Sequence, residues 1–334
     1  MDFRQVFADH ELRTEFMDRF DEIRAAVAGA SGLEGLEGGL DADLAAQATS
    51  RMAEGVWQDD DSGIEAIVLR FARPVHLVRK GTFRTSPDGF PESSEIAKVL
   101  EAGRIPLERA IPSVGRIDLR NHRLNWVGTG WMAGLGLAVT NRHVAQEFAA
   151  AGDRGFAFRT ISGQRTHAVL DWHREYRQPE ESRFRVTEVL WIEPDSSHLD
   201  MALLRIAETG EAGEPQPPAI ELLTDLGSGQ AGVGRWVAVI GYPGNDSRAD
   251  PQDRQRIFDG VYDHKRLAAG KVTAAEPGGL VHHDATTLGG NSGSAVIDLA
   301  TGKALALHFG GAAGLRNHAV GAPALARLIR DHTT

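Results

Sequence analysis

The chain of 334 residues contains no cysteine. Without thiols it can form no disulfide, bind no metal through thiolates and use no cysteine nucleophile. It also lacks any apolar run approaching the roughly 20 residues that cross a bilayer, and its first residues contain no uninterrupted apolar segment of the kind that directs export. We therefore expect a cytoplasmic protein with no membrane partner.

An excess of basic residues is absent as well. Residues 1–65 contain 16 Asp and Glu against 5 Lys and Arg, a net charge of −11, whereas the remainder contains 30 acids and 31 bases, a net of +1, which together give −10. A polyanion would be repelled by this acidic segment and would meet no basic block later, so we expect no nucleic-acid partner. A solvated helical surface is the simpler interpretation of the acidity, and a docking face for a regulatory protein is the alternative.

The N-terminal third shows mainly helical periodicity. Apolar residues recur at three- and four-residue steps from Phe3 to Val27, which predicts an amphipathic helix. A glycine-rich stretch at 32–39 interrupts the pattern, helical spacing returns at 41–55, and short helical patterns over Ser93–Ala110 end before Pro112. The length fits about two domains, so we predict an acidic, mainly α regulatory or docking domain at 1–110 and a second domain at 111–334.

The sequence after Pro112 is dominated by short apolar or alternating runs separated by glycine turns. Such spacing is typical of an all-β barrel or sandwich. A closing segment, Ala322–Arg330, has helical spacing with Pro323 in its first turn. The predicted strands are Asn125–Ala133, Leu137–Thr140, Arg183–Ile192, Met201–Ile206, Trp236–Ile240, Lys271–Ala274, Ser294–Asp298 and Ala304–His308.

Three motifs, each beside a predicted strand, contain a histidine, an aspartate and a serine in that order. The first is LAVTNRHV, which ends a predicted hairpin and contains His143; the second is HLDMALLRI, in which Asp200 precedes an apolar strand; the third is TTLGGNSGSAV, which contains Ser292. Burial at a strand raises the pKa of an aspartate in general, so Asp200 needs hydrogen bonds to stay ionised. The glycines on both sides of Ser292 allow a tight turn whose main-chain N–H groups converge.

These three residue types are what acyl transfer requires. A serine hydroxyl is a weak nucleophile until a base removes its proton, and the base needs a third group that fixes its tautomer. Ser292 is therefore the predicted nucleophile, His143 the proton shuttle and Asp200 the group that orients His143. The N–H groups of Gly290 and Ser292 are the predicted oxyanion hole, in which one donor is worth about 3–4 kcal/mol of the barrier.

Each motif alone is more often a structural feature, but their joint occurrence in this order is far less common by chance. From about Val114 to His332 the chain resembles the bacterial trypsin-like serine peptidases of the chymotrypsin clan, especially glutamyl endopeptidases and Deg-type proteases. The resemblance depends on GTGW…TNRHV, DMALLRI, VIGYPG at Val239–Gly244, GGNSGSAV at Gly289–Val296 and LHFGG at Leu307–Gly311. It implies a mainly β fold with two packed antiparallel barrels, His143 and Asp200 in the first and Ser292 in the second, and a protein or peptide as substrate.

One position departs from the trypsin pattern. Trypsin-type zymogens carry, just before the catalytic serine, an Asp that pairs with a newly freed N-terminal ammonium, and this chain has Asn291 there. Because an amide has no charge, we expect no activation by that ion pair. Any switch would then act through the N-terminal domain or a partner.

Thr287 and His308 are the candidate substrate-binding residues. They match the threonine and histidine with which glutamyl endopeptidases hold an acidic side chain, and no acidic residue between Thr286 and Ser292 offers a counter-charge to Lys or Arg. Cleavage after Glu, or Asp, is the prediction. The alternative is an apolar preference in which His308 is a packed strand residue.

We expect no metal and no cofactor. His282, His283 and Asp284 are adjacent on one predicted strand, where neighbouring side chains point to opposite faces, so the two imidazoles are poorly placed to chelate one ion. A structural or pocket-wall role is the favoured interpretation of these residues. Two alternatives to an ordinary endopeptidase stay open from the sequence. One is a catalytically silent, protease-like binding module, and the other is a regulated effector of bacterial stress or defence.

Overall fold

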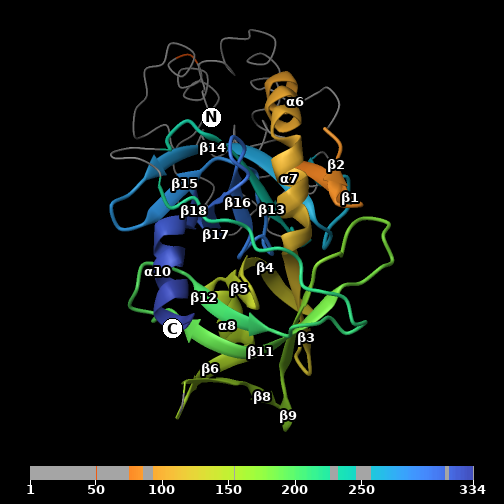
Figure 1. The fold of residues 1–334 in the computed structure, drawn as a ribbon, viewed down its shortest axis with the longest axis vertical. Helices are drawn as coiled ribbons and strands as arrows, with labels where there is room; N and C mark the ends of the chain where they lie inside the picture. Colours follow the sequence, from red (N-terminus) through yellow and green to blue (C-terminus); the bar gives the residue numbers. More distant parts are fainter. Residues whose placement is uncertain are drawn as a thin grey trace.

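The computed structural model describes residues 50, 75–85, 93–153, 155–225, 232–245, 257–312 and 316–333. Two β-barrels lie one above the other, and a C-terminal helix runs beside them (Figure 1). The predicted helix at 3–27 lies outside the described residues, as does the predicted helix at 41–55 apart from residue 50.

The first barrel is a closed sheet with the strand order β10-β11-β12-β5-β4-β3. All of its neighbouring strands are antiparallel. Along each strand, successive side chains point alternately to the interior and to the outside of the barrel. The strands are β3 (Val114–Arg120), β4 (Trp126–Gly134), β5 (Leu137–Thr140), β10 (His167–Asp171), β11 (Arg183–Ile192) and β12 (Ala202–Ile206). Outside the barrel lie helix α8 (Arg142–Phe148) and two small hairpins, β6 (Ala149–Gly152) with β7 (Gly155–Phe158) and β8 (Thr160–Ile161) with β9 (Gln164–Arg165).

The second barrel has the strand order β13-β16-β17-β18-β15-β14, and a pairing between β13 and β14 closes it. Its strands are β13 (Trp236–Gly241), β14 (Arg266–Ala275), β15 (Leu280–His283), β16 (Ala295–Asp298), β17 (Ala304–Ala312) and β18 (Arg316–Gly321). The two closed barrels and the helix α10 (Ala322–Thr333) confirm the predicted chymotrypsin-like fold class.

Each barrel has its own apolar interior. Phe148, Trp172 and Phe184 are among the buried side chains of the first barrel, and Val239, Phe258 and Leu305 among those of the second. A third cluster fills the space between the barrels and under the helices, where Leu325 and Leu328 of α10 join Leu199 from the first barrel. Burial of the apolar surface in this third cluster holds the two barrels together.

Polar contacts also join the barrels. Lys265, which precedes β14, is fully buried, and its Nζ donates to the main-chain oxygens of Ile111 (2.9 Å) and Trp172 (2.6 Å). Burial lowers the pKa of Lys265 to about 8, although Glu175 and Asp171 act in the opposite direction. At the other side of the junction, the ring of His332 in α10 stacks on Trp191 of β11 with centroids 4.3 Å apart.

The part of the predicted N-terminal domain that is described is packed against the second barrel. It contains β1 (Val75–Arg79), β2 (Thr82–Phe83), α6 (Ser93–Ala102), α7 (Arg104–Ala110) and the single turn η2 (Ile111–Ser113). Strand β1 pairs with β14, and Ile96, Leu100 and Leu107 enter the cluster between the barrels. The helical pattern at 93–110 thus corresponds to two helices, whereas the domain boundary at 110 stays a prediction.

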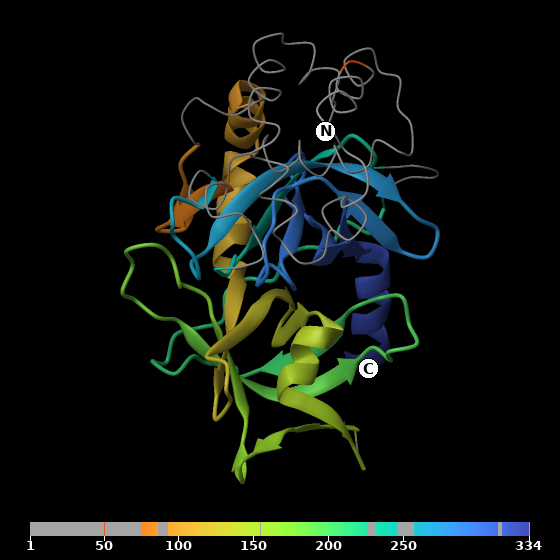
Figure 2. The same cartoon turned by 180° about the vertical axis from the view of Figure 1, so that it is seen from behind.

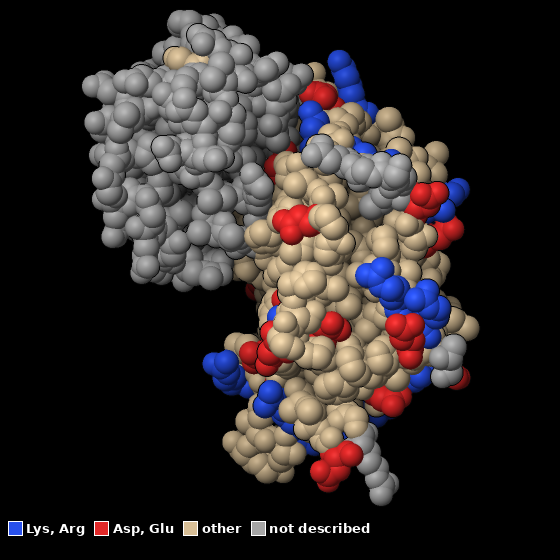
Figure 3. Space-filling model, turned by 90° about the vertical axis from the view of Figure 1, so that its left-hand side faces the viewer, with Lys and Arg blue, Asp and Glu red and all other residues tan. Residues whose placement is uncertain are grey.

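On the face shown in Figure 3, the described Lys and Arg side chains alternate with Asp and Glu side chains and do not gather into one patch. None of the helices in the described ranges has the length and apolar character that spanning a bilayer requires.

Candidate active site

His143 lies in the first turn of α8 and not at the end of a strand, as the sequence pattern had suggested. Strand β5 ends at Thr140, Asn141 precedes the helix, and α8 begins at Arg142. Val144, Ala145 and Phe148 bury the inner face of α8 against the first barrel, where Figure 2 shows it as a short yellow-green helix. The His143 side chain is 47% exposed, so the imidazole faces solvent from a fixed main chain.

Asp200 lies in the segment that connects β11 to β12, and its side chain is 10% exposed. Its Oδ2 lies 2.5 Å from Nδ1 of His143, and its Oδ1 accepts the main-chain N–H of His143 at 3.2 Å. Asn141 Nδ2 donates to the main-chain oxygen of Asp200 at 2.8 Å. Because a carboxylate oxygen accepts from Nδ1–H, this contact leaves Nε2 of His143 with the lone pair that a base needs.

Ser292 lies in a tight turn between β15 and β16. The flanking glycines adopt left-handed backbone angles, with φ of +91° at Gly290 and +90° at Gly293. The main-chain N–H of Thr129, in β4, donates to the oxygen of Ser292 at 2.8 Å. This bond ties the turn, which belongs to the second barrel, to the first barrel that holds His143 and Asp200.

Two N–H groups of this turn point to no acceptor in the described part of the chain. Asn291, Gly293 and Ser294 donate to the main-chain oxygens of Leu288, His308 and Asn291. For Gly290 and Ser292 the described residues provide no such acceptor. An exposed or half-buried N–H pair in one turn is the arrangement that can receive a negatively charged oxygen.

His308 and Thr287 both belong to the second barrel, His308 in β17 and Thr287 in the segment that follows β15. His308, in β17, is 2% exposed, and its Nδ1 lies 3.1 Å from Nε2 of His283 in β15. The Thr287 hydroxyl donates to Oδ1 of Asn317 at 2.8 Å, and Asn317, in β18, is the cross-strand partner of His283. Burial holds the pKa of His308 well below its usual range, and the neighbouring imidazoles of His283, His143 and His318 add to this effect.

The structure therefore brings His143 and Asp200 into direct contact. It ties Ser292 to the same junction through Thr129, and the hydrogen bond from the Gly293 N–H to the His308 oxygen, 2.8 Å long, links the serine turn to β17. The catalytic and substrate-binding roles stay predictions. Asn141 and Asn317 were not predicted from the sequence, whereas for His283 the strand geometry had favoured a structural or pocket-wall role over metal binding. The available signal for Asn141 was its place, with Arg142, in the polar pair that precedes His143.

The two adjacent histidines of β15 face different partners, as strand alternation predicts. Nε2 of His282 lies 2.7 Å from Oε1 of Glu276, whereas Nε2 of His283 contacts His308. Within the described ranges, no group of three or more His, Asp or Glu side chains is arranged to hold a metal ion.

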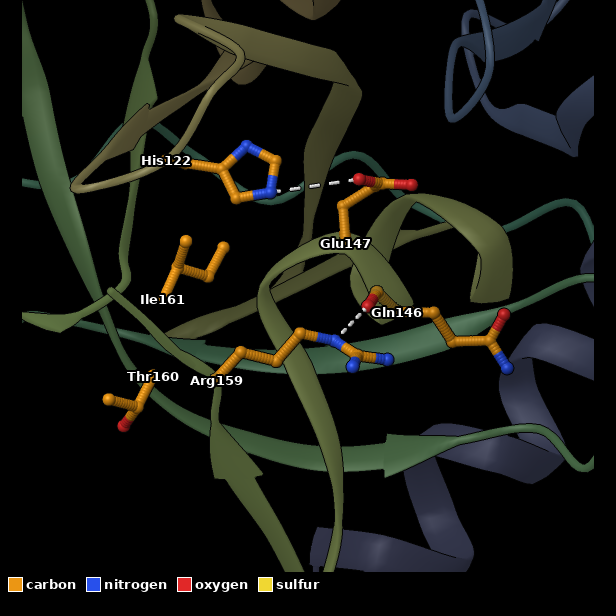
Figure 4. A pocket seen from close by; sticks show the side chains of 6 residues that line it. All are labelled: His122, Gln146, Glu147, Arg159, Thr160 and Ile161. Atoms are coloured by element: carbon orange, nitrogen blue, oxygen red, sulfur yellow. Dashed lines mark hydrogen bonds and ion pairs between the residues drawn. The ribbon is translucent and has the colours of Figure 1, made fainter. Parts of the chain in front are cut away.

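A cavity of about 470 Å³ lies at the C-terminal end of α8, away from these residues. In Figure 4 the ring of His122 faces Glu147 at 3.7 Å, and Arg159 Nε donates to the main-chain oxygen of Gln146 at 2.6 Å. None of the predicted site residues lines it.

Two packed six-stranded barrels with a histidine–aspartate pair and a glycine-flanked serine at their junction define a chymotrypsin-like peptidase fold. The family model of the trypsin-like peptidase domain matches residues 128–307, more than half of the chain. The chain therefore belongs to the family of trypsin-like peptidase domains. Its enzyme class is that of the serine endopeptidases, which are hydrolases.

Individual proteins are similar to this chain as well. A probable serine protease of Lysobacter enzymogenes is 29% identical over an alignment of 288 residues, which covers 78% of this chain and 73% of that protein. The crystal structure of the serine endoprotease from Yersinia pestis aligns with a TM-score of 0.45 at 16% identity. That alignment covers 68% of this chain and 64%, just under two thirds, of the Yersinia chain.

Proposed function

We propose that the protein hydrolyses peptide bonds through an acyl-enzyme formed on Ser292, with His143 as base and Asp200 as the group that orients it. The observation that carries this proposal is the 2.5 Å contact between His143 Nδ1 and Asp200 Oδ2, in a structure that also ties the turn of Ser292 to the first barrel. The contact selects the imidazole tautomer that accepts a proton at Nε2.

In the proposed reaction, the Ser292 oxygen attacks the scissile carbonyl while His143 Nε2 takes the hydroxyl proton. The carbonyl oxygen becomes negatively charged and is received by the N–H groups of Gly290 and Ser292. His143 then delivers the proton to the leaving amine, and the acyl group stays on Ser292. Water repeats the sequence, giving its proton to His143 and its oxygen to the acyl carbon, and the serine hydroxyl is restored.

The hydrogen bonds around His308 support a preference for an acidic residue before the scissile bond. The N–H of Ala285 donates to Nδ1 of His283 at 3.3 Å, so the proton of that ring is on Nε2 and is donated to His308 Nδ1. The proton of His308 is then on Nε2, for which the described residues provide no acceptor. A neutral imidazole held in this tautomer offers one directed N–H to a substrate carboxylate.

Thr287 is the second proposed contact for the substrate. Its hydroxyl has one proton, which the bond to Asn317 uses. Binding of a carboxylate by Thr287 therefore requires the hydroxyl to rotate away from Asn317. The preference we propose is thus for Glu, with His308 as the principal donor.

The test uses a fluorophosphonate probe and a peptide library on the full chain. We expect the probe to label the protein, and the label to disappear in Ser292→Ala. No labelling under any activating condition would favour a silent binding module instead. Peptides that differ only in the residue before the scissile bond should be cleaved best with Glu; faster cleavage after Leu, Phe or Arg would remove the acidic preference and leave the hydrolase assignment intact.

We also propose that residues 1–110 regulate the protease or dock a partner. In support, β1 is a strand of the second-barrel sheet, and the oxygen of Ile111, which follows α7, accepts from the interbarrel Lys265. Deleting residues 1–74 leaves β1 in place and should change activity or the set of bound proteins. Unchanged activity and binding would contradict this role.

A further inference from the structure

The carboxylate of Asp200 owes its position to a connecting segment and not to a strand. Strand β11 ends at Ile192 and β12 begins at Ala202, so Asp200 lies in the irregular stretch 193–201. Irregular segments hold a side chain less firmly than a strand does unless their main-chain groups are tied. Something must hold this stretch if the 2.5 Å contact with His143 is to persist.

Arg142 contacts this stretch at four points. Its Nη1 donates to the main-chain oxygens of Pro194 (2.7 Å), Ser197 (3.1 Å) and Leu199 (3.1 Å). Its Nε lies 3.6 Å from Oδ1 of Asp195, and the side chain is 17% exposed. Three carbonyl dipoles therefore converge on one cationic nitrogen, and hydrogen bonds from a charged donor are stronger than neutral ones.

Together with Arg142, its two neighbours Asn141 and His143 also bind the stretch that contains Asp200. Asn141 holds the main-chain oxygen of Asp200, His143 holds both carboxylate oxygens, and Arg142 holds the residues that lead up to Asp200. All three lie in the turn that leads from β5 into α8: Asn141 connects the two elements, and Arg142 and His143 are the first residues of α8. A shift of the stretch 193–201 would therefore have to break bonds to this turn.

Helix α8 adds a further anchor. Gln146, one turn after Arg142, donates from Nε2 to Oδ1 of Asp195 at 2.8 Å. The main-chain oxygen of Gln146 is in turn held by Arg159, on the opposite side, as Figure 4 shows. Arg159 thus binds α8 without touching the stretch that contains Asp200, which makes it a matched control for Arg142.

We infer that Arg142 is a positioning residue of the catalytic site, whose guanidinium fixes the 194–199 segment and through it the carboxylate of Asp200 against His143. The inference rests on the proposed function, because it assigns Arg142 to the support of the same histidine–aspartate pair. Without the guanidinium, three carbonyl groups lose a shared donor and the segment can relax. The carboxylate then spends less time in contact with Nδ1, and proton removal from Ser292 slows.

The experiment measures the reaction of a fluorophosphonate probe with the full chain, separated into the maximal labelling rate and the apparent probe affinity. A misplacement on the order of 1 Å at a supporting residue can cost about 100-fold in rate. We expect Arg142→Met to lower the maximal rate by about 10- to 100-fold while the probe affinity changes by less than about twofold. Arg142→Lys keeps one cationic donor, so its maximal labelling rate should lie between those of Arg142→Met and the wild type. Arg159→Met should be labelled as fast as the wild type.

A double-mutant cycle separates positioning from general structural support. If Arg142 acts through Asp200, Arg142→Met should change the labelling rate by less than about twofold in an Asp200→Asn background. A full additional loss in that background, or wild-type labelling by Arg142→Met alone, would overturn the inference. If Arg142→Met does not fold, Arg142→Lys decides: wild-type rates in the single variant, or a full extra loss in the Asp200→Asn background, overturn it.

Two outcomes distinguish a failure of the proposed function from a failure of the role of Arg142. Asp200→Asn labelled as fast as the wild type would defeat the proposed function itself. Slow labelling of Asp200→Asn together with unchanged labelling of the Arg142 variants would defeat only the role of Arg142.

Discussion

The main-chain N–H of Thr129 donates a 2.8 Å hydrogen bond to the main-chain oxygen of Ser292. Thr129 belongs to the first barrel and Ser292 to the second, so this bond joins the two halves of the candidate active site. The close approach is possible because Gly293 has no side chain: a Cβ there would lie 1.9 Å from the oxygen of Thr129 and 2.7 Å from Oγ1 of Thr140.

Replacement of Gly293 should therefore abolish labelling by the fluorophosphonate probe. In Gly293→Ala the methyl group meets the main chain of β4, and the residue must also keep φ near +90°. We expect a loss of at least about 3 kcal/mol of unfolding free energy, measured by urea denaturation. The matched control is Gly213→Ala. Gly213 has a similar φ of +87°, but a Cβ there would meet no atom within 4 Å, so this replacement should lower the unfolding free energy by only about 1 kcal/mol. Equal losses in the two variants would show that the approach to Thr129 is unimportant.

His283 should influence specificity through His308. In His283→Phe the ring volume is kept, but the donor to His308 Nδ1 is lost, so the His308 proton is free to move from Nε2 to Nδ1. We expect kcat/KM for peptides with Glu before the scissile bond to fall by about tenfold, with little change for peptides with Leu. His282→Phe is the control, since His282 contacts Glu276 instead. A parallel loss for both peptides would argue against a specificity role.

Stability should fall between about pH 6.5 and pH 4 in part because of His76. Burial lowers the pKa of His76 from 6.5 to about 4, with a smaller opposing effect of its hydrogen bond to the Arg84 oxygen. Below pH 6.5 the unfolded chain binds a proton that the folded chain refuses, so folding loses up to about 3 kcal/mol by pH 4. The lowered pKa of His308 acts in the same direction.

The check is urea denaturation of His76→Gln beside the wild type near pH 7 and near pH 5. Because glutamine does not titrate, the variant should lose less stability on acidification. An identical loss in both proteins would show that His76 is not responsible.

Lys265 should be essential to the junction of the barrels. Lys265→Met removes the ammonium that binds the oxygens of Ile111 and Trp172 and leaves the buried Glu175 without its cation, 3.7 Å away. Removal of one partner from a buried charge cluster costs about 3 kcal/mol or more, read from the midpoint of denaturation. Lys303→Met, at a surface pair with Glu221, should cost less than about 1 kcal/mol. An unchanged unfolding free energy in Lys265→Met would contradict this role.

The sequence predicted those strands in which apolar residues either alternate with polar ones or form an unbroken run. Strands β5 and β11 have the predicted bounds, and β13 and β16 differ by one residue. Strand β3 was missed because Arg116 and Asp118 interrupt its apolar pattern, yet both are buried as an ion pair with a 2.6 Å contact. Strand β18 was missed for a related reason, since its Asn317 and His318 are polar and gain partners only across the barrel.

The order of His143, Asp200 and Ser292 and the glycines around the serine were readable from the chain alone, because residue chemistry and left-handed turns are local properties of the sequence. The sequence alone also determined that no thiol chemistry is available. The tertiary structure decided which side chains meet: Asp200 against His143, His283 against His308, and Arg142 against the segment before Asp200. Such contacts join residues from different strands, helices and loops, and they depend on strand register, on barrel closure and on the packing between the barrels, which no local pattern encodes.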